Sequence, residues 1–176
     1  MLEKRGDILY VGVDESNHGR FPEIFVAVAS FNYQDSLIFP DLKKLRKEQQ
    51  LVSSLRIRDY RYSVISKEHY ERYSAKNIMP LVSSKLIESF SLECEFLNCY
   101  IDGEFRLDQK KLLEGLIKNQ ESLIFQSVLI KDVPKGDKRQ TNYIISLADG
   151  WASWIAKNIN TERITSGMVK RKVEFI

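Results

Sequence analysis

The sequence has few of the residues that mark secreted, membrane-spanning or zinc-binding proteins. Its 176 residues include only two cysteines and two histidines, too few for a disulfide scaffold and a poor supply of zinc ligands. No apolar run approaches the ~20 residues that a bilayer-spanning helix needs. The first residues are charged and lead directly into a strand-like segment, unlike a signal peptide. We therefore expect a cytoplasmic protein with no membrane contact.

The two cysteines, Cys94 and Cys99, fall within one predicted strand. Because they are five residues apart, a regular strand would place them on opposite faces of its sheet. That arrangement favours two buried or half-buried thiols over a disulfide or a metal pair.

The excess of basic residues is small, with a formal net charge of +3. This value does not by itself indicate a nucleic-acid partner. The basic residues form clusters at 43–47, 56–61, 135–139 and 170–172. Such clusters can follow a phosphate backbone, although a solvated surface is the commoner explanation for any one of them.

The hydrophobic pattern predicts one α/β domain over residues 1–176. Strands are predicted at 8–14, 24–29, 61–65, 92–101 and 123–130. Helices are predicted at 66–90, from an N-cap at Asp108, and at 141–158, and 41–50 forms a short helix or an ordered loop. Pro80 either kinks or divides the first of these helices. The residues 161–176 are expected to be loosely packed or to add a short strand at 173–176.

The resulting order, β-β-β-α-β-α-β-α, predicts a mixed sheet covered by helices. Because crossovers between parallel strands are right-handed, few topologies remain open to this order. The order matches a three-layer ribonuclease-H-like fold with helices on both faces of the sheet.

Three aspartates fall where such a fold would bring them together. Asp14 ends an otherwise apolar strand, where a charge is costly unless it is paired, solvated or bound to metal. Asp102 also follows a strand, and Asp149 lies at the border of the apolar stripe of the last helix. Magnesium and manganese ions prefer several converging carboxylates. Glu15 points the other way in a regular strand, but joins the cluster if the chain turns there.

Each acid also has a simpler explanation. Asp14 can begin a turn with the polar residues that follow it, Asp102-Gly103 can be an ordinary turn, and Asp149 can pair with a lysine. The occurrence of all three at the expected elements favours the cluster.

Several segments resemble a known family. VGVDESNHGR, CYIDGEF and KGDKRQTNYIISLADGWA resemble, in order, parts of ribonuclease HII. The Asp-Glu-Ser opening and the late Ala148-Asp149 pair are closer still to a set of uncharacterised ribonuclease-H-like proteins. The resemblance implies a metal-dependent nuclease in which Asp14, Asp102 and Asp149 bind Mg²⁺ or Mn²⁺ in a two-metal site. It makes Glu15 a fourth acid.

The resemblance does not extend to substrate choice. The Gly-Arg-Gly of ribonuclease HII is replaced by Asn17-His18-Gly19-Arg20, so the contact with a lone ribonucleotide is not carried over. RNA, DNA and hybrid substrates all remain open. The candidate substrate-binding residues are His18, Arg20, Lys135, Lys138 and Arg139. The oligomeric state is not predicted.

Two other functions are consistent with the sequence. The first is a ribonuclease-H-like binding or assembly module without catalysis, which the incomplete family motifs favour. The second is an α/β protein of another topology, whose acids are unrelated turn residues. Trp151 shares the apolar stripe of the last helix and is expected in the core, with Trp154 more open.

Overall fold

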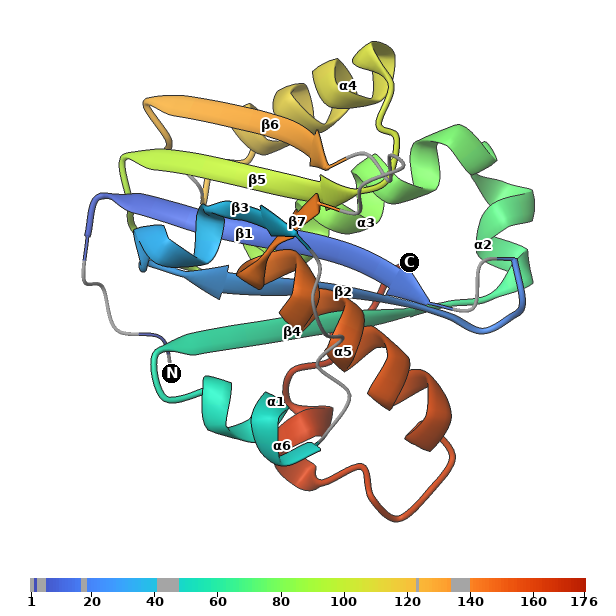
Figure 1. Ribbon diagram of the computed structural model, residues 1–176. Helices are drawn as coiled ribbons and strands as arrows, with labels where there is room; N and C mark the ends of the chain where they lie inside the picture. Colours follow the sequence, from blue (N-terminus) through green and yellow to red (C-terminus); the bar gives the residue numbers. More distant parts are fainter. Residues whose placement is uncertain (1, 3–5, 17–18, 41–47, 123, 134–139) are drawn as a thin grey trace.

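The computed structural model describes residues 2, 6–16, 19–40, 48–122, 124–133 and 140–176. Its centre is a five-stranded sheet in the order β4-β2-β1-β5-β6 (Figure 1). Its strands are β1 (Ile8–Ser16), β2 (Glu23–Ser30), β4 (Arg58–Ile65), β5 (Phe96–Asp102) and β6 (Ser127–Val133). A small second sheet pairs β3 (Ile38–Pro40) with β7 (Gln140–Asn142).

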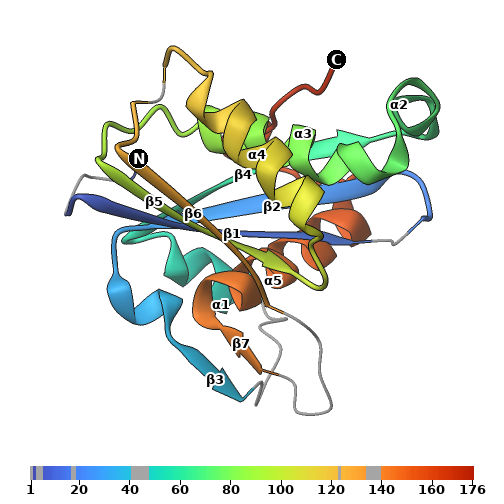
Figure 2. The same ribbon diagram turned by 90° about the horizontal axis from the view of Figure 1, so that it is seen from above.

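The helices cover both faces of the larger sheet. They are α1 (Glu48–Ser54), α2 (Lys67–Arg72), α3 (Ala75–Glu88), α4 (Leu107–Lys118), α5 (Tyr143–Asn158) and α6 (Ser166–Val169), with a 3-10 helix η1 (Tyr33–Ser36). Figure 2 shows α2, α3 and α4 on one side of the sheet, and α1, α5 and the β3–β7 pair on the other. The sequence-based prediction of a mixed sheet between two helical layers is confirmed.

The strand directions follow from how the strands are connected. β1 pairs antiparallel with β2, and β2 pairs antiparallel with β4. β5 and β6 are instead reached through helices and run parallel to β1, as strands joined by helical crossovers do. β1 therefore lies in the middle of the sheet, with β2 on one side and β5 on the other.

The alternation of side chains along β1 produces two cores. Leu9, Val11 and Val13 are buried against the face that α3 and α4 cover. Tyr10 is buried on the opposite face, among residues of α5. A strand covered on both faces must be apolar on both, which explains the nearly continuous hydrophobic run of β1.

The helix predicted over 66–90 is divided, but not at Pro80. Tyr73 has extended backbone angles, and Ser74 is the N-cap of the second part. Pro80 lies inside α3, where it has no N–H to donate to the carbonyl of Lys76. The side-chain amide of Gln109, on α4, donates to that carbonyl at 2.7 Å. The partner helix thus satisfies the group that proline leaves open.

Other predicted boundaries shift by a few residues. β5 begins at Phe96, which lies opposite Ile8 at the start of β1, because the residues before it have no strand beside them. β6 extends to Val133, three residues past its predicted end. The N-cap of α4 is Arg106 and not Asp108, which lies in the first turn and pairs with Arg106 at 2.7 Å.

The prediction that the two cysteines face opposite sides is wrong. Cys94 precedes β5, so strand alternation does not apply to it. Neither cysteine forms a disulfide, and both are buried in the same core, on the α3–α4 face. Burial raises the pKa of the Cys99 thiol to about 12.

The residues after 161 contact the sheet and form no regular terminal strand. The backbone N–H of Tyr62 donates to Arg171 O, and the N–H of Val173 donates to Tyr62 O. Phe175 is buried in the core on the α3–α4 face. No helix among the described residues is long and apolar enough to cross a membrane.

Candidate active site

The candidate site forms where α5 crosses the end of β1. On its α5 face, β1 presents Gly12, Asp14 and Ser16 in turn, because alternate residues of a strand share a face. A Cβ atom on Gly12 would lie 2.8 Å from the backbone carbonyl of Ile144, so α5 rests directly on the strand there. The hydroxyl of Ser16 donates to Ala152 O at 3.1 Å. Asp14 therefore lies beneath the part of α5 between these contacts, which carries Asp149.

Asp102 reaches the same place from the neighbouring strand. β5 runs parallel to β1, and the last residues paired are Val13 and Ile101. One residue further, Asp14 and Asp102 are next to each other on the same face, the face on which Tyr100 is buried. Gly103 follows with a positive φ of 82°, so the chain turns away immediately after the aspartate.

The pKa of Asp14 reflects its burial and the acids around it. Its side chain is only 3% exposed. Burial raises the pKa of Asp14 well above its ordinary value, and the charges of Asp102, Glu15 and Asp149 raise it further. A backbone hydrogen bond from Glu15 N to Asp14 Oδ1, at 2.8 Å, acts in the opposite direction. The other three acids that the sequence singles out are thus near enough for their charges to act on Asp14.

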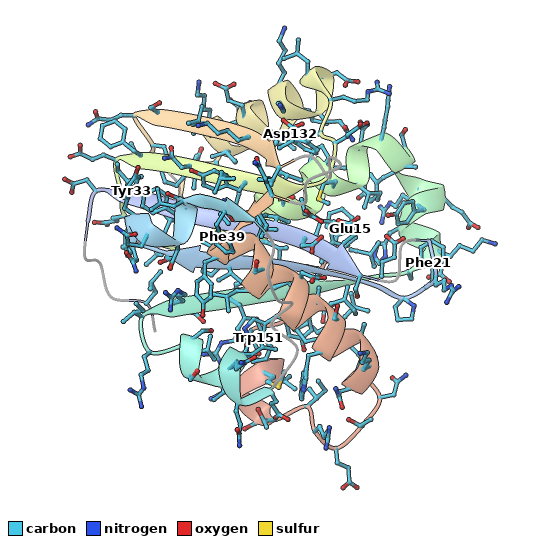
Figure 3. The ribbon with its side chains drawn as sticks, viewed as in Figure 1. Glu15, Phe21, Tyr33, Phe39, Asp132 and Trp151 are labelled. Carbon is cyan, nitrogen blue, oxygen red and sulfur yellow. The ribbon has the colours of Figure 1, made fainter. Side chains whose placement is uncertain are left out.

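Glu15 differs from the other three acids in its orientation. β1 stays regular through Ser16, and Glu15 lies opposite Phe25, whose ring is in the core on the α3–α4 face. The chain does not turn at this point, so Glu15 faces away from α5. In Figure 3 it lies near the end of β1. Its contribution to Asp14 is the backbone N–H and a nearby negative charge.

The acids are grouped but do not form a finished ligand sphere. Within the described residues, no three side chains of His, Cys, Asp or Glu are arranged so that they could hold a metal ion as they stand. The donor atoms are nevertheless all carboxylate oxygens, the ligands that Mg²⁺ and Mn²⁺ prefer.

Sequence reasoning missed acids at this end of the sheet, among them Asp132. Asp132 lies in β6 beside Ile101 and forms an ion pair with Lys110 of α4. In Figure 3 it lies near β6 and α4. The sequence hides it because the predicted strand ends at Ile130, which leaves Asp132 in a polar loop. The ion pair with Lys110 gives Asp132 a structural role.

The candidate substrate-binding residues are only partly described. Arg20 is exposed in the connection between β1 and β2. His18, Lys135, Lys138 and Arg139 lie outside the described residues. Trp151 is buried on α5 as predicted, and Trp154, expected to be more open, is buried as well.

Solved structures with the same fold are found by comparison. The fold resembles ribonuclease HII from Archaeoglobus fulgidus, in its complex with PCNA, with a TM-score of 0.58 and 19% identity over 85% of this chain and 73% of that one. For ribonuclease H2 from Pyrococcus horikoshii the TM-score is 0.56, with 17% identity over 91% of this chain and 77% of that one.

A third similar structure is that of Bst-RNase HIII in complex with Mn²⁺. Its TM-score is 0.55, with 12% identity over 94% of this chain and 61% of that one. No protein-family model and no curated protein matches the sequence. Identities this low establish the fold alone. The chain therefore has a ribonuclease-H-like fold.

Proposed function

We propose that the protein is a metal-dependent nuclease, which hydrolyses phosphodiester bonds of RNA, DNA or a hybrid of the two. The observation that carries this proposal is the position of Asp14. It is a buried carboxylate at the end of a central strand, beside Asp102, beneath the helix that bears Asp149, and destabilised by their charges. A protein has little reason to keep several mutually repelling acids together unless a cation joins them.

In this proposal Asp14, Asp102 and Asp149 hold Mg²⁺ or Mn²⁺. Bound there, the metal would activate a water molecule and stabilise the leaving oxygen of the phosphodiester. Asp14 is held in place by the N–H of Glu15, at 2.8 Å. Asp102 is fixed by the end of β5, and Asp149 by the contact of α5 with Gly12. Glu15 is the fourth acid of the group and orients Asp14 through its backbone.

The ligands come from separate elements, so the fold itself sets the distance between them. Two are on adjacent parallel strands and one is on the helix above. The similar structure of Bst-RNase HIII contains Mn²⁺, which supports a divalent cation as the cofactor here. Arg20, exposed just beyond β1, would meet substrate phosphates, and the sequence adds His18, Lys135, Lys138 and Arg139 as further contacts.

The decisive experiment compares the wild type with Asp14→Asn. We expect saturable Mn²⁺ binding by calorimetry in the wild type, and its loss in the variant. We expect metal-dependent cleavage of at least one of single-stranded RNA, DNA or a hybrid, also lost in the variant. Asp132→Asn is the matched control, because Asp132 lies at the same end of the sheet but is paired with Lys110. Full metal-dependent cleavage by Asp14→Asn would overturn the mechanism.

A binding or assembly module without catalysis is the second candidate. The observation that favours it is that no three His, Cys, Asp or Glu side chains in the described part of the chain are arranged to hold a metal ion as they stand. Under this alternative, wild type and Asp14→Asn bind equally little Mn²⁺, both with nucleic acid present and without it. The same calorimetric titration therefore separates the two functions.

A further inference from the structure

A pair of aromatic rings lies just beyond the end of β1. Phe21, in the connection between β1 and β2, is 40% exposed. The ring of Tyr70, on α2, meets it edge to face, with 5.3 Å between the ring centroids and 64° between the planes. The neighbours Gly19, Arg20 and Pro22 are also exposed. The segment therefore presents one aromatic ring and one cation to solvent.

The surroundings of this exposed ring are held to the sheet by the buried carboxylate of Glu23. The hydroxyl of Tyr70 donates to a carboxylate oxygen of Glu23. The other carboxylate oxygen of Glu23 accepts from the backbone N–H of Gly19. Glu23 is buried at the start of β2, opposite Ile65 of β4. One carboxylate thus ties both the chain before Phe21 and the ring beside it to the end of the sheet.

The aromatic pair lies at the same end of the sheet as the acids. The charge of Glu15 contributes to raising the pKa of Tyr70, after burial and the contact with Glu23. The same charge raises the pKa of Asp14. Glu15 is therefore near both Tyr70 and Asp14. Figure 3 shows Phe21 on the Glu15 side of the molecule and Tyr33 on the other.

We infer that Phe21, supported by Tyr70, stacks against a nucleobase of a single-stranded segment whose backbone passes the carboxylates of Asp14, Asp102 and Asp149. Arg20 faces the phosphates of the same segment. This inference rests on the proposed function and adds a contact that selects for an unpaired base. A fixed ring next to a cation suits this role, because stacking needs only a flat face and loses little entropy when the ring is already held.

A protein partner is a poorer match for this surface. Stable protein interfaces bury about 800 Å² on each partner, whereas the apolar surface here is one phenylalanine and one proline. A base stacked on one ring needs no larger area.

The test measures binding to a short fluorescein-labelled single-stranded oligonucleotide by anisotropy, in EDTA so that cleavage cannot occur. We expect Phe21→Ala to weaken binding about tenfold, within the range for loss of one stacked base. Phe21→Trp should bind at least as tightly as the wild type. Tyr33→Ala is the matched control. Tyr33 is 59% exposed and meets Tyr10 edge to face, but it lies near the start of β1.

A second substrate separates stacking from a change in the turn. An oligonucleotide with abasic sites keeps its phosphates but has no base to stack, so wild type and Phe21→Ala should bind it equally. Equal binding of the intact strand by both proteins, or no binding by the wild type, would overturn the inference. Either result leaves the Mn²⁺ titration of Asp14→Asn to decide the proposed function. Conversely, if the oligonucleotide stacks on Phe21 but is not cleaved when Mn²⁺ is present, only the proposed nuclease activity is overturned.

Discussion

Gly12 of β1 and Ile144 of α5 are in contact with no room for a side chain between them. A Cβ on Gly12 would lie 2.8 Å from both the backbone carbon and the backbone oxygen of Ile144. Atoms of the backbone cannot rotate away as a flexible side chain can, so the helix itself would have to move. The same helix carries Asp149 over Asp14. The glycine therefore sets the height of the helix at the candidate site.

Gly12→Ala should destabilise the protein by about 1–3 kcal/mol, the usual cost of overpacking a core. It should also weaken Mn²⁺ binding, because α5 is lifted away from β1. Urea unfolding measures the first effect and calorimetry the second.

Gly115→Ala is the control for this prediction. Gly115 is in α4, and a Cβ there meets nothing within 4 Å. This change should leave Mn²⁺ binding unaltered and raise the free energy of unfolding by about 0.5–1 kcal/mol, since alanine is the better helix former. Equal stability of the two variants would show that α5 does not rest on Gly12.

The sequence predicts the order of the main strands and helices, and the elements on which Asp14, Asp102 and Asp149 lie, because each follows from a local pattern. A buried strand that ends in an acid, and an apolar stripe with an acid at its border, are both visible within a few residues. The break between α2 and α3 is not visible in this way. Proline suggests a break at Pro80, but a side chain far along the sequence, Gln109, satisfies the carbonyl that proline leaves open.

The contacts that join Phe21, Tyr70 and Glu23 are also not visible in the sequence, for a similar reason. It joins three elements through side chains, and no residue pattern marks it. Glu23 in particular looks like an exposed acid before a strand, yet it is buried and both its oxygens are occupied. Tertiary contacts of this kind depend on the distance between elements, which a single sequence does not give.

Phe175→Ala should destabilise the protein by about 3 kcal/mol, the low end of the range for a buried phenylalanine. Phe175 is 8% exposed in the core on the α3–α4 face. Its ring contacts the rings of His69 and Tyr73, with 5.4 Å between the ring centroids in each pair. The adjacent Ile176 is 86% exposed, so Ile176→Ala should change stability by less than about 0.5 kcal/mol. Urea unfolding of both variants checks this, and a similar small effect in both would mean that the segment is not part of the core.

Asp14→Asn should make the metal-free protein more stable at neutral pH. The pKa of Asp14 is raised above its ordinary value of 3.8, so the folded state binds a proton that the unfolded state releases. The contribution of Asp14 to the stability of the wild type is then fully present below pH 3.8 and is lost as the pH rises through the folded-state pKa. Asparagine does not titrate, so the advantage of the variant should appear over the same pH window. Urea unfolding in EDTA at a series of pH values measures it.

Asp108→Asn provides a control of opposite sign. Asp108 is exposed in the first turn of α4, and the hydrogen bond from Arg106 lowers its pKa. Its contribution to stability is therefore present above pH 3.8 and lost as the pH falls. The asparagine variant should be no more stable than the wild type at neutral pH. If both variants behave alike, the effect at Asp14 comes from removing a negative charge in general and not from the cluster.

Asp102→Asn and Asp149→Asn should each reduce cleavage about 100-fold or more. A bound metal provides several kcal/mol of transition-state stabilisation, and each 1.36 kcal/mol corresponds to a factor of ten in rate. Asp132→Asn should keep nearly full activity, although Asp132 lies in the strand next to Asp102, because its carboxylate faces α4 and pairs with Lys110. Initial rates at saturating Mn²⁺ compare the three variants. Asp132 and Asp102 are neighbours on adjacent strands, so loss of activity in all three variants would indicate general damage at this edge of the sheet. Loss of activity in Asp102→Asn and Asp149→Asn alone would identify the face of the sheet on which the chemistry occurs.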